Sequence, residues 1–203
     1  MKEELKKINK SITKNLKKFW DFLQKDSLAS TVVFLLLAVI FLVVIFFPTL
    51  SLITGSDYPL VIVESCSMYH HEYGFEKTFT SPLYEKNGIS IEDTKNWDFQ
   101  NGLKKGDIIF IVGPKKVKQG EVIIFAGRGI ATPIIHRIID DDEPYGTKGD
   151  NYISNSRQLT GVETEIAEDQ ILGKAVFRIP ALGWVKLIFF DWKNPKDRQG
   201  FCK

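Results

Sequence analysis

The chain has 203 residues, of which 44% are hydrophobic and 26% charged, and its formal net charge at pH 7 is +2. This length allows one membrane anchor and one folded domain of ordinary size, and excludes a second large domain. The charge excludes a strongly basic protein, and because no basic stripe with interleaved aromatic side chains continues into the folded part, we expect no nucleic acid partner.

Residues 1–26 form a lysine-rich arm. Apolar residues recur in it at steps of three and four, which predicts an amphipathic helix with lysines on its other faces. This apolar row consists of Leu5, Ile8, Ile12, Leu16, Phe19 and Leu23. A solvated arm and a coiled-coil strand are the alternatives. We favour a helix on the bilayer surface, since the arm leads straight into an apolar segment.

Residues 27–56 carry no charged side chain. The stretch 28–47 is apolar enough, at about 1.5 Å rise per residue, to cross about 30 Å of hydrocarbon. A cleaved signal peptide has a shorter apolar core, of about 7 to 15 residues, so we predict a transmembrane helix. Lysines precede this helix and Asp57 follows it. The positive-inside rule therefore places residues 1–26 in the cytoplasm and residues 57–203 outside it.

Beyond the anchor, short β-branched runs alternate with Gly, Pro and Asp turns, which is typical of an antiparallel all-β domain. We expect strands, or turns followed by strands, at 61–63, 105–112, 119–125, 133–139 and 173–180. Asp107 and Glu121 each follow a turn glycine, so we assign their carboxylates to the turn backbone and not to catalysis. The expected fold class is mainly β, an antiparallel β domain with one N-terminal transmembrane α-helix.

Two segments do not follow this strand pattern. Residues 69–103 lack a sustained period and are broken by Gly and Pro, so we interpret them as a long insertion with one short helix at 89–99. Residues 182–192 are apolar and aromatic but too short to span a membrane. A membrane-interface segment and a core strand under the domain explain them about equally well.

Ser67 is the candidate nucleophile, because it ends an apolar run close behind the anchor. If the run is a strand, Ser65 and Ser67 share one face and Cys66 lies on the other. A serine hydroxyl near neutral pH needs a base, and His136 is the histidine that a regular strand would hold in place. Asp150, in a Gly-Asp-Asn turn, offers a carboxylate to orient the imidazole.

These residues lie in a series of motifs that covers nearly all of the chain beyond the anchor. The motifs are Ser65-Cys66-Ser67-Met68, Lys105-Gly106-Asp107-Ile108-Ile109, Gly120-Glu121-Val122-Ile123-Ile124-Phe125, Ile135-His136-Arg137, Thr147-Lys148-Gly149-Asp150-Asn151, Gly173-Lys174 and Ile179-Pro180-Ala181-Leu182-Gly183. In this order they resemble the boxes of type I signal peptidases of the archaeal and endoplasmic-reticulum type.

The resemblance implies a signal-peptidase-like β catalytic domain that acts as a serine endopeptidase, a hydrolase that removes signal peptides from exported preproteins. It implies Ser67 as nucleophile, His136 where bacterial relatives place a lysine general base, and Asp150 as the acid. The Ser65 hydroxyl and the Ser67 backbone N–H would form the oxyanion hole.

The same resemblance implies no cofactor and no metal. The partners it implies are signal-peptide-bearing preproteins, the lipid bilayer and the secretion machinery. The chain would be a single-pass protein of the cell membrane, or of the endoplasmic-reticulum membrane in a eukaryote. Its amino terminus would be cytoplasmic and its catalytic domain extracytoplasmic.

Three features depart from the family pattern. The insertion 69–103 is longer than the few residues usual between the serine box and the first Gly-Asp strand. Position 66 is Cys where Gly, Glu or Asn is more familiar. Many members carry another acid a few residues after Gly-Asp-Asn, whereas this chain has serine and asparagine at 154–156. The third catalytic role therefore stays open between Asp150 alone and Asp150 together with Asp140, Asp141 or Asp142.

Several other readings compete with the serine peptidase. A zinc site could be built by residue type from His70, His71, Glu72 and His136. The sequence has no C-x-x-C or H-E-x-x-H spacing, which disfavours such a site. A cysteine protease would use Cys66 with His136, but strand alternation turns position 66 away from the Ser67 face. The two cysteines, Cys66 and Cys202, do not look like a disulfide framework.

The alternative from another functional class is a non-catalytic subunit that binds signal peptides and has the same fold. The joint presence of a serine, a histidine and an acid favours the enzyme.

Overall fold

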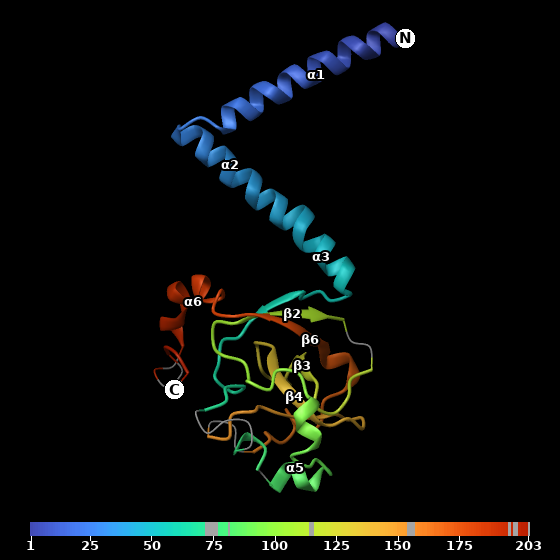
Figure 1. Ribbon diagram of the computed structural model, residues 1–203, viewed down its shortest axis with the longest axis vertical. Coiled ribbons are helices and arrows are strands. Elements are labelled where there is room, and N and C mark those ends of the chain that lie inside the picture. The colour runs from blue at the N-terminus through green and yellow to red at the C-terminus, as the bar shows by residue number, and fades with distance from the viewer. Residues whose placement is uncertain are drawn as a thin grey trace. The chain divides into compact units, whose positions relative to one another are not determined.

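The computed structural model describes residues 1–71, 77–80, 82–113, 116–153, 157–194, 196 and 199–202. The chain separates into two compact units, Met1–Leu50 and Ser51–Lys203. The first unit consists of helices, and the second contains a sheet with short helices around it (Figure 1).

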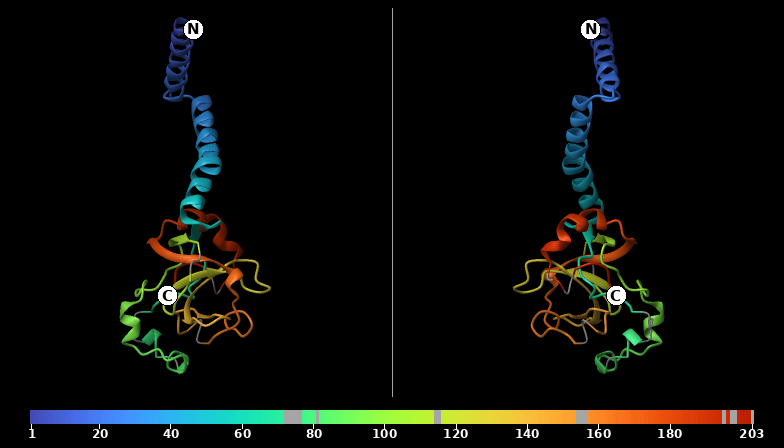
Figure 2. Two further views of the ribbon diagram at one scale, coloured as in Figure 1. Left: turned by 90° about the vertical axis from the view of Figure 1, so that its right-hand side faces the viewer. Right: turned by 90° about the vertical axis from the view of Figure 1, so that its left-hand side faces the viewer.

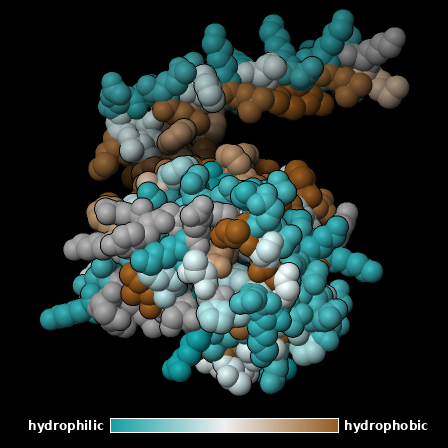
Figure 3. Space-filling view, turned by 60° about the horizontal axis from the view of Figure 1, so that its bottom comes forward, coloured by the Kyte–Doolittle hydropathy of each residue, from teal (hydrophilic) through white to brown (hydrophobic). Residues whose placement is uncertain are grey.

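Helix α1 (Lys2–Leu23) confirms the helix expected in the lysine-rich arm. Its apolar side chains line one side and its polar side chains the other (Figure 3). A short break separates α1 from α2 (Leu28–Phe41), where Ser27 caps the new helix by accepting a hydrogen bond from the Ser30 N–H at 3.2 Å. The Ser30 hydroxyl donates to the Leu23 carbonyl at 2.8 Å, which ties the two helix ends together.

Helix α2 continues through the π-helical turn η1 (Leu42–Phe46) into α3 (Phe47–Thr54). Together they form one helix of 27 residues that is long and apolar enough to cross a membrane, and only 6% of its most apolar window is buried. The π turn ends two residues before Pro48, whose ring and missing N–H disturb the regular hydrogen bonds of the turn before it. A core helix of a soluble protein would be mostly buried, so this exposure favours a membrane span.

Six strands form one antiparallel sheet, which confirms the expected fold class (Figure 1). The strands are β1 (Leu60–Ile62), β2 (Ile108–Val112), β3 (Val122–Phe125), β4 (Ile134–Asp140), β5 (Gly146–Lys148) and β6 (Ile171–Ile179). Their order in the sheet is β1-β2-β6-β3-β4-β5, so the last strand of the chain lies between β2 and β3. The short 3₁₀ helix η3 (Glu168–Gln170) leads into β6.

Strand β3 is buried on both faces, which explains its continuous apolar sequence. Alternate side chains point to opposite sides, so Val122 and Ile124 enter one core cluster while Ile123 and Phe125 enter another. In the neighbouring strand β4, His136 lies opposite Ile123 and Arg137 lies opposite Val122. The side chains of His136 and Arg137 therefore project from opposite faces of the sheet.

The described part of the insertion 69–103 is packed against the sheet and is not a loose excursion. It contains helix α5 (Pro82–Lys86) and the 3₁₀ helix η2 (Asp93–Asn96), the latter within the stretch predicted to hold a short helix. A third core cluster joins Phe79, Tyr84 and Ile89 of the insertion to Ile139 of β4. The Leu103 N–H donates to the Met68 carbonyl at 2.8 Å, so the two ends of the insertion lie together.

Residues 184–192 are helical, so the interpretation of 182–192 as a core strand is wrong. Helix α6 (Trp184–Phe190) is followed by the 3₁₀ helix η4 (Asp191–Lys193). Leu187 is buried, whereas Val185, Ile188 and Phe189 keep 67%, 70% and 68% of their surface exposed. This exposed apolar side is typical of a helix at a membrane interface. Helix α6 and helix α5 lie at opposite ends of the second unit (Figure 2).

Candidate active site

The segment Ser65–Met68 leaves β1 as a bend and a turn and does not continue the strand. The ladder with β2 ends where the Val63 N–H donates to the Asp107 carbonyl and the Gly106 N–H donates to the Val63 carbonyl, both at 2.9 Å. The Ser65 and Ser67 hydroxyl oxygens nevertheless lie 3.2 Å apart. The two serines thus approach each other as expected, although a turn and not a strand brings them together.

Asn151 fixes this serine segment from the side of the Gly-Asp-Asn turn. Its side-chain amide donates to the Cys66 carbonyl at 2.8 Å. Its backbone N–H donates to the Ser67 carbonyl, also at 2.8 Å. Met68 is anchored in the core, with 1% of its surface exposed. The serine segment is therefore attached to the turn that follows β5, and β5 pairs with the strand that carries His136.

His136 is buried in β4, and its Nδ1 contacts Oε1 of Glu163, whose side chain is fully buried. Glu163 is held in turn by the Leu159 N–H, which donates to Oε2 at 2.6 Å. The Glu163 carbonyl accepts from the Thr147 N–H of β5 at 2.7 Å. The carboxylate at the imidazole is thus Glu163, which lies beyond the motifs that the sequence analysis used.

Asp150 has a different set of partners from the one expected. Its Oδ1 accepts from Nε of Arg137 at 3.0 Å and its Oδ2 from Nη2 of Arg137 at 2.7 Å. His70 Nε2 lies 3.0 Å from the same Oδ2. Burial would raise the pKa of Asp150, but the Arg137 guanidinium and the hydrogen bond with His70 outweigh it and hold that pKa well below its usual range. Asp150 is a buried anion bound to Arg137, which projects from the face of the sheet opposite His136.

Arg137 also attaches the insertion to the sheet. The guanidinium carbon lies 5.3 Å from the ring centre of Trp97 and 5.8 Å from that of Phe79. Nη1 donates to the Asp98 carbonyl at 2.9 Å and to the Gly120 carbonyl at 2.7 Å. One side chain therefore joins the insertion, the turn before β3 and the Asp150 carboxylate.

A second buried cation lies beside this cluster. Lys148 of β5 lies opposite Arg137 of β4 in the strand register. Its ammonium donates to the Gly149 carbonyl at 2.7 Å. Burial lowers the pKa of Lys148, although the nearby carboxylates of Asp150 and Glu163 oppose that shift. Burial likewise raises the pKa of the Tyr84 phenol, whose ring centre lies 5.5 Å from the Lys148 ammonium.

The acidic run at 140–142 shapes the turn between β4 and β5. Asp140 Oδ1 accepts from the Asp142 N–H at 3.2 Å, and Asp141 Oδ2 accepts from the Gln119 N–H at 3.2 Å. Asp141 and Asp142 are exposed and Asp140 is half-buried. Asp140 and Asp141 thus hold the backbone of this turn, and the carboxylate in contact with the His136 ring is that of Glu163.

The structural roles predicted for Asp107 and Glu121 are confirmed. Asp107 accepts from the Lys104 N–H at 2.8 Å and from the Ala181 N–H at 3.1 Å. Glu121 accepts from the Lys118 N–H at 3.0 Å and from the Lys174 ammonium at 2.6 Å. Each carboxylate thus closes its own turn and contacts a second segment.

Cys66 and Cys202 form a disulfide, so the expectation that these two cysteines are not a disulfide framework is wrong. The bonded sulfur of Cys66 is not a thiolate, which removes the cysteine-protease alternative for this form of the protein. Glu72 of the alternative zinc site and residues 154–156 lie outside the described residues. Among the residues that are described, no group of three or more His, Cys, Asp or Glu is arranged to hold a metal ion.

No family model matches the chain. Several curated proteins are similar to it, and they are described as catalytic subunits of the signal peptidase complex. The chain is 25% identical over 156 residues to SEC11C of Homo sapiens, a match that covers 72% of this chain and 65% of that protein. It is 26% identical over 154 residues to SEC11 of Yarrowia lipolytica, covering 72% of each. For sec11 of Dictyostelium discoideum the identity is 29% over 102 residues, covering 45% of this chain and 56% of the relative.

Proposed function

We propose that this homologue of the SEC11 catalytic subunits of signal peptidase is a membrane-anchored serine endopeptidase that removes signal peptides from exported preproteins. The similarity confirms the resemblance to type I signal peptidases that the sequence motifs indicated. The observation that carries the proposal is the pairing of His136 with the buried Glu163, since an oriented imidazole is what a serine nucleophile requires.

In the proposed reaction the Ser67 hydroxyl attacks the carbonyl carbon of the scissile peptide bond, and His136 accepts the hydroxyl proton. When Nδ1 carries hydrogen and donates to Glu163, Nε2 has the lone pair that a general base uses. The imidazolium that forms is stabilised by the Glu163 carboxylate. It then gives its proton to the leaving amine, and water hydrolyses the acyl-enzyme by the same route.

The oxyanion of the tetrahedral intermediate needs donors beside Ser67. The Ser65 hydroxyl, whose oxygen is 3.2 Å from that of Ser67, and the Ser67 backbone N–H are the groups we assign to this role. A preorganised donor of this kind contributes about 3 kcal/mol to stabilisation of the transition state.

We assign Asp150 a positioning role. It fixes the turn that presents Asn151, and Asn151 holds the Cys66 and Ser67 carbonyls. The hydrogen bonds between Asp150 and Arg137 connect that turn to the strand of His136. Asp150 would thus act on the reaction through the placement of Ser67, and Glu163 would take the role of the orienting acid.

The apolar helix is the proposed membrane anchor. Where it ends, the Gly113 N–H donates to the Thr54 carbonyl at 2.8 Å, and the Ser56 hydroxyl donates to the Leu172 carbonyl at 3.0 Å. Residues 54–56, at the end of α3, are therefore hydrogen-bonded to residues beside β2 and in β6. A peptidase attached in this way acts on substrates held by the same bilayer, which suits preproteins delivered by the secretion machinery. The anchor would be single-pass, with the amino terminus in the cytoplasm.

The test is incubation of the purified full-length chain in detergent with a preprotein, followed by mass determination of the products. We expect one cut after the signal peptide, and no cut with Ser67→Ala. Wild-type protein that binds the preprotein without cleaving it would show a non-catalytic signal-peptide-binding subunit and overturn the proposal.

A further inference from the structure

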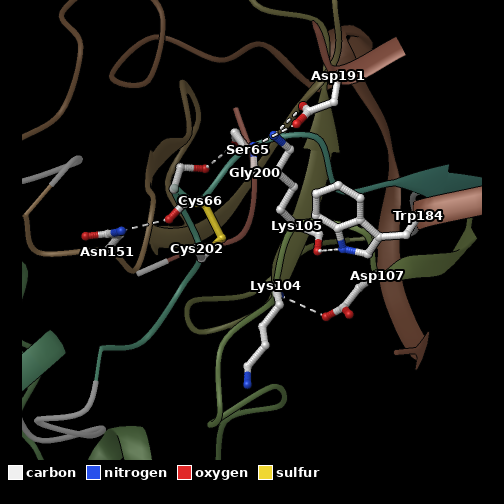
Figure 4. The surroundings of a disulfide bond; sticks show 11 residues. Ser65, Cys66, Lys104, Lys105, Asp107, Asn151, Trp184, Asp191, Gly200 and Cys202 are labelled. Atoms are coloured by element: carbon white, nitrogen blue, oxygen red, sulfur yellow. Dashed lines mark hydrogen bonds and ion pairs between the residues drawn. A yellow bond between two sulfur atoms is a disulfide. The ribbon is translucent and has the colours of Figure 1, made fainter. Parts of the chain in front are cut away.

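Cys66, in the middle of the serine segment, is attached in two ways: its carbonyl accepts a hydrogen bond, and its sulfur forms a covalent bond. The carbonyl of Cys66 faces Asn151, while its sulfur is bonded to Cys202 near the carboxyl end of the chain (Figure 4). The two cysteines are 136 residues apart in the sequence. The residue between Ser65 and Ser67 is thus covalently tied to a distant segment.

The segment that carries Cys202 is itself fixed to the fold. Asp191 accepts hydrogen bonds from the Lys105 ammonium and from the Gly200 N–H, the latter at 2.7 Å. The hydrogen bond from Lys105 lowers the pKa of Asp191 to about 2, so this carboxylate stays charged at the pH values where the protein would work. The Phe201 ring packs on Trp184 of α6, with ring centres 4.5 Å apart. The disulfide therefore ends on an anchored segment and not on a loose tail.

Asp191 and Trp184, the two residues that hold the carboxyl-terminal segment, both contact the turn at 104–107. The Trp184 indole N–H donates to the Lys105 carbonyl at 3.0 Å. The next residue, Gly106, has φ +91°, and a Cβ there would lie 2.1 Å from the Trp184 ring, so only glycine fits beneath it. Gly106 also donates to the Val63 carbonyl, just before the serine segment. The serine segment, the turn at 104–107, α6 and the carboxyl-terminal segment thus form a closed ring of contacts that the disulfide completes (Figure 4).

We propose that the Cys66–Cys202 disulfide is a positioning element of the peptidase site, which holds the Ser67 hydroxyl in place by tying its segment to the carboxyl-terminal segment. The inference rests on the proposed function. The segment 64–68 lies outside the strands. Besides the disulfide it is held by hydrogen bonds from Asn151, Leu103 and Tyr69 and by the exposed ion pair of Glu64 with Lys186, so the disulfide is its one covalent link to a distant segment. An extracytoplasmic location would let such a bond persist.

The test uses purified full-length protein in detergent, because the chain has two cysteines in total and a reductant can act on this bond only. A dithiol such as dithiothreitol supplies two electrons and two protons; the protein disulfide becomes two thiols and the dithiol becomes its cyclic disulfide. We expect kcat for preprotein cleavage to fall about 10- to 100-fold with KM nearly unchanged, since displaced reacting groups cost rate more than binding. Re-oxidation should restore kcat.

Two further measurements separate positioning from general stability. Amide hydrogen exchange should speed up in the peptide that contains 65–71 after reduction, while exchange in β3 and β4 stays unchanged. Cys202→Ser should reproduce the low kcat, and Cys66→Ser/Cys202→Ser should show the same low kcat with no further response to dithiothreitol.

Each outcome decides the proposal. It is overturned if the reduced protein, with both thiols confirmed by mass, keeps its kcat, or if the peptide 65–71 keeps its slow exchange. Faster exchange throughout the sheet would overturn it too, because the bond would then act on the whole fold. If oxidised wild-type protein cleaves no preprotein, the proposed function has failed, and the exchange of 65–71 alone then decides whether the disulfide fixes the serine segment.

Discussion

Arg137 binds Asp150 through two hydrogen bonds to its two carboxylate oxygens, Nε to Oδ1 at 3.0 Å and Nη2 to Oδ2 at 2.7 Å, with both side chains fully buried. The paired geometry is the one in which a guanidinium recognises a carboxylate most strongly. Arg137 follows His136 in β4, and Asp150 precedes Asn151, which holds Ser67. This ion pair therefore connects the strand of the proposed base to the turn that supports the proposed nucleophile.

Replacing Asp150 by Asn should destabilise the protein strongly. The change keeps the size of the side chain but leaves the buried Arg137 charge without its counter-ion, and breaking a buried pair in this way costs roughly 3–5 kcal/mol. Urea unfolding at neutral pH should therefore show a much lower free energy of unfolding for Asp150→Asn. The exposed Asp141→Asn is the matched control and should change it by less than about 1 kcal/mol. Equal stability of the two variants would contradict a structural ion pair.

The same variant should have a characteristic pH dependence. The pKa of Asp150 is held below its ordinary value in the folded protein, so the stability it contributes is fully present above about pH 4, where the unfolded carboxyl is also ionised. As the pH falls lower, the unfolded chain takes up the proton first and the contribution is lost. The difference between wild type and Asp150→Asn should thus stay constant from pH 7 to about 5 and shrink below 4. A difference that already shrinks between pH 7 and 5 would contradict the depressed pKa.

The neighbouring histidines His70 and His71 should differ in their effect on stability. His70 is 9% exposed and contacts Asp150 Oδ2 at 3.0 Å, whereas His71 makes edge contacts with the rings of Tyr69 and Tyr152. His70→Ala removes a hydrogen bond to a buried anion, which costs about 1.5–3 kcal/mol, and should lower the midpoint of thermal unfolding more than His71→Ala does. The reverse order, measured by circular dichroism, would be evidence against the role of His70 in the Asp150 cluster.

Much of the fold could be predicted because local signals specify it. Glycine turns precede β2 and β3, and β-branched runs give strands within a few residues of their observed bounds. The hydroxyl oxygens of Ser65 and Ser67 also lie close together, although a turn brings them there and not the expected strand alternation. These features depend on neighbours in the sequence, where periodicity carries the information.

The remaining features depend on contacts between distant segments. Glu163 reaches His136 because residues 159–166 run beside β5, where Tyr145 and Ile166 form a bridge, and no spacing rule encodes that approach. The disulfide depends on α6, after which the chain returns toward Cys66. The Gly-Asp-Asn turn predicts Asp150 as an acid, but its observed partner Arg137 follows from the direction of that side chain on β4, which is opposite to that of His136.

The proposed topology predicts which part of the chain a protease can reach. Lysines flank the amino end of the apolar helix and Asp57 follows its carboxyl end. Protease added to intact cells or to sealed right-side-out vesicles should therefore digest residues after 57 and spare the lysine-rich arm, as detected with a tag at each end. Detergent permeabilisation is the control that should expose both. Protection of the carboxyl-terminal part in sealed vesicles would rule out this orientation.

The last prediction separates Glu163 from Asp150 as the acid that serves His136. Glu163→Gln keeps the shape of the side chain and can still accept from the Leu159 N–H, but it removes the charge that stabilises the imidazolium and favours the tautomer with hydrogen on Nδ1. The corresponding change in an established serine protease triad lowers kcat by about 10⁴-fold. We therefore expect Glu163→Gln to lower kcat by about 10³- to 10⁴-fold with little change in KM, measured on the same preprotein.

When two residues act as one catalytic unit, the losses of kcat caused by replacing each of them do not add. A double variant is therefore the control for the role of Glu163. His136→Ala/Glu163→Gln should be hardly slower than His136→Ala alone, because the acid acts through the imidazole. Asp150→Asn acts on Ser67 through Asn151, so its loss of rate should follow its loss of stability and be partly relieved at lower temperature. If Asp150→Asn instead abolished cleavage while folded, and Glu163→Gln cleaved at the wild-type rate, the orienting acid would be Asp150 and the assignment of Glu163 would be wrong.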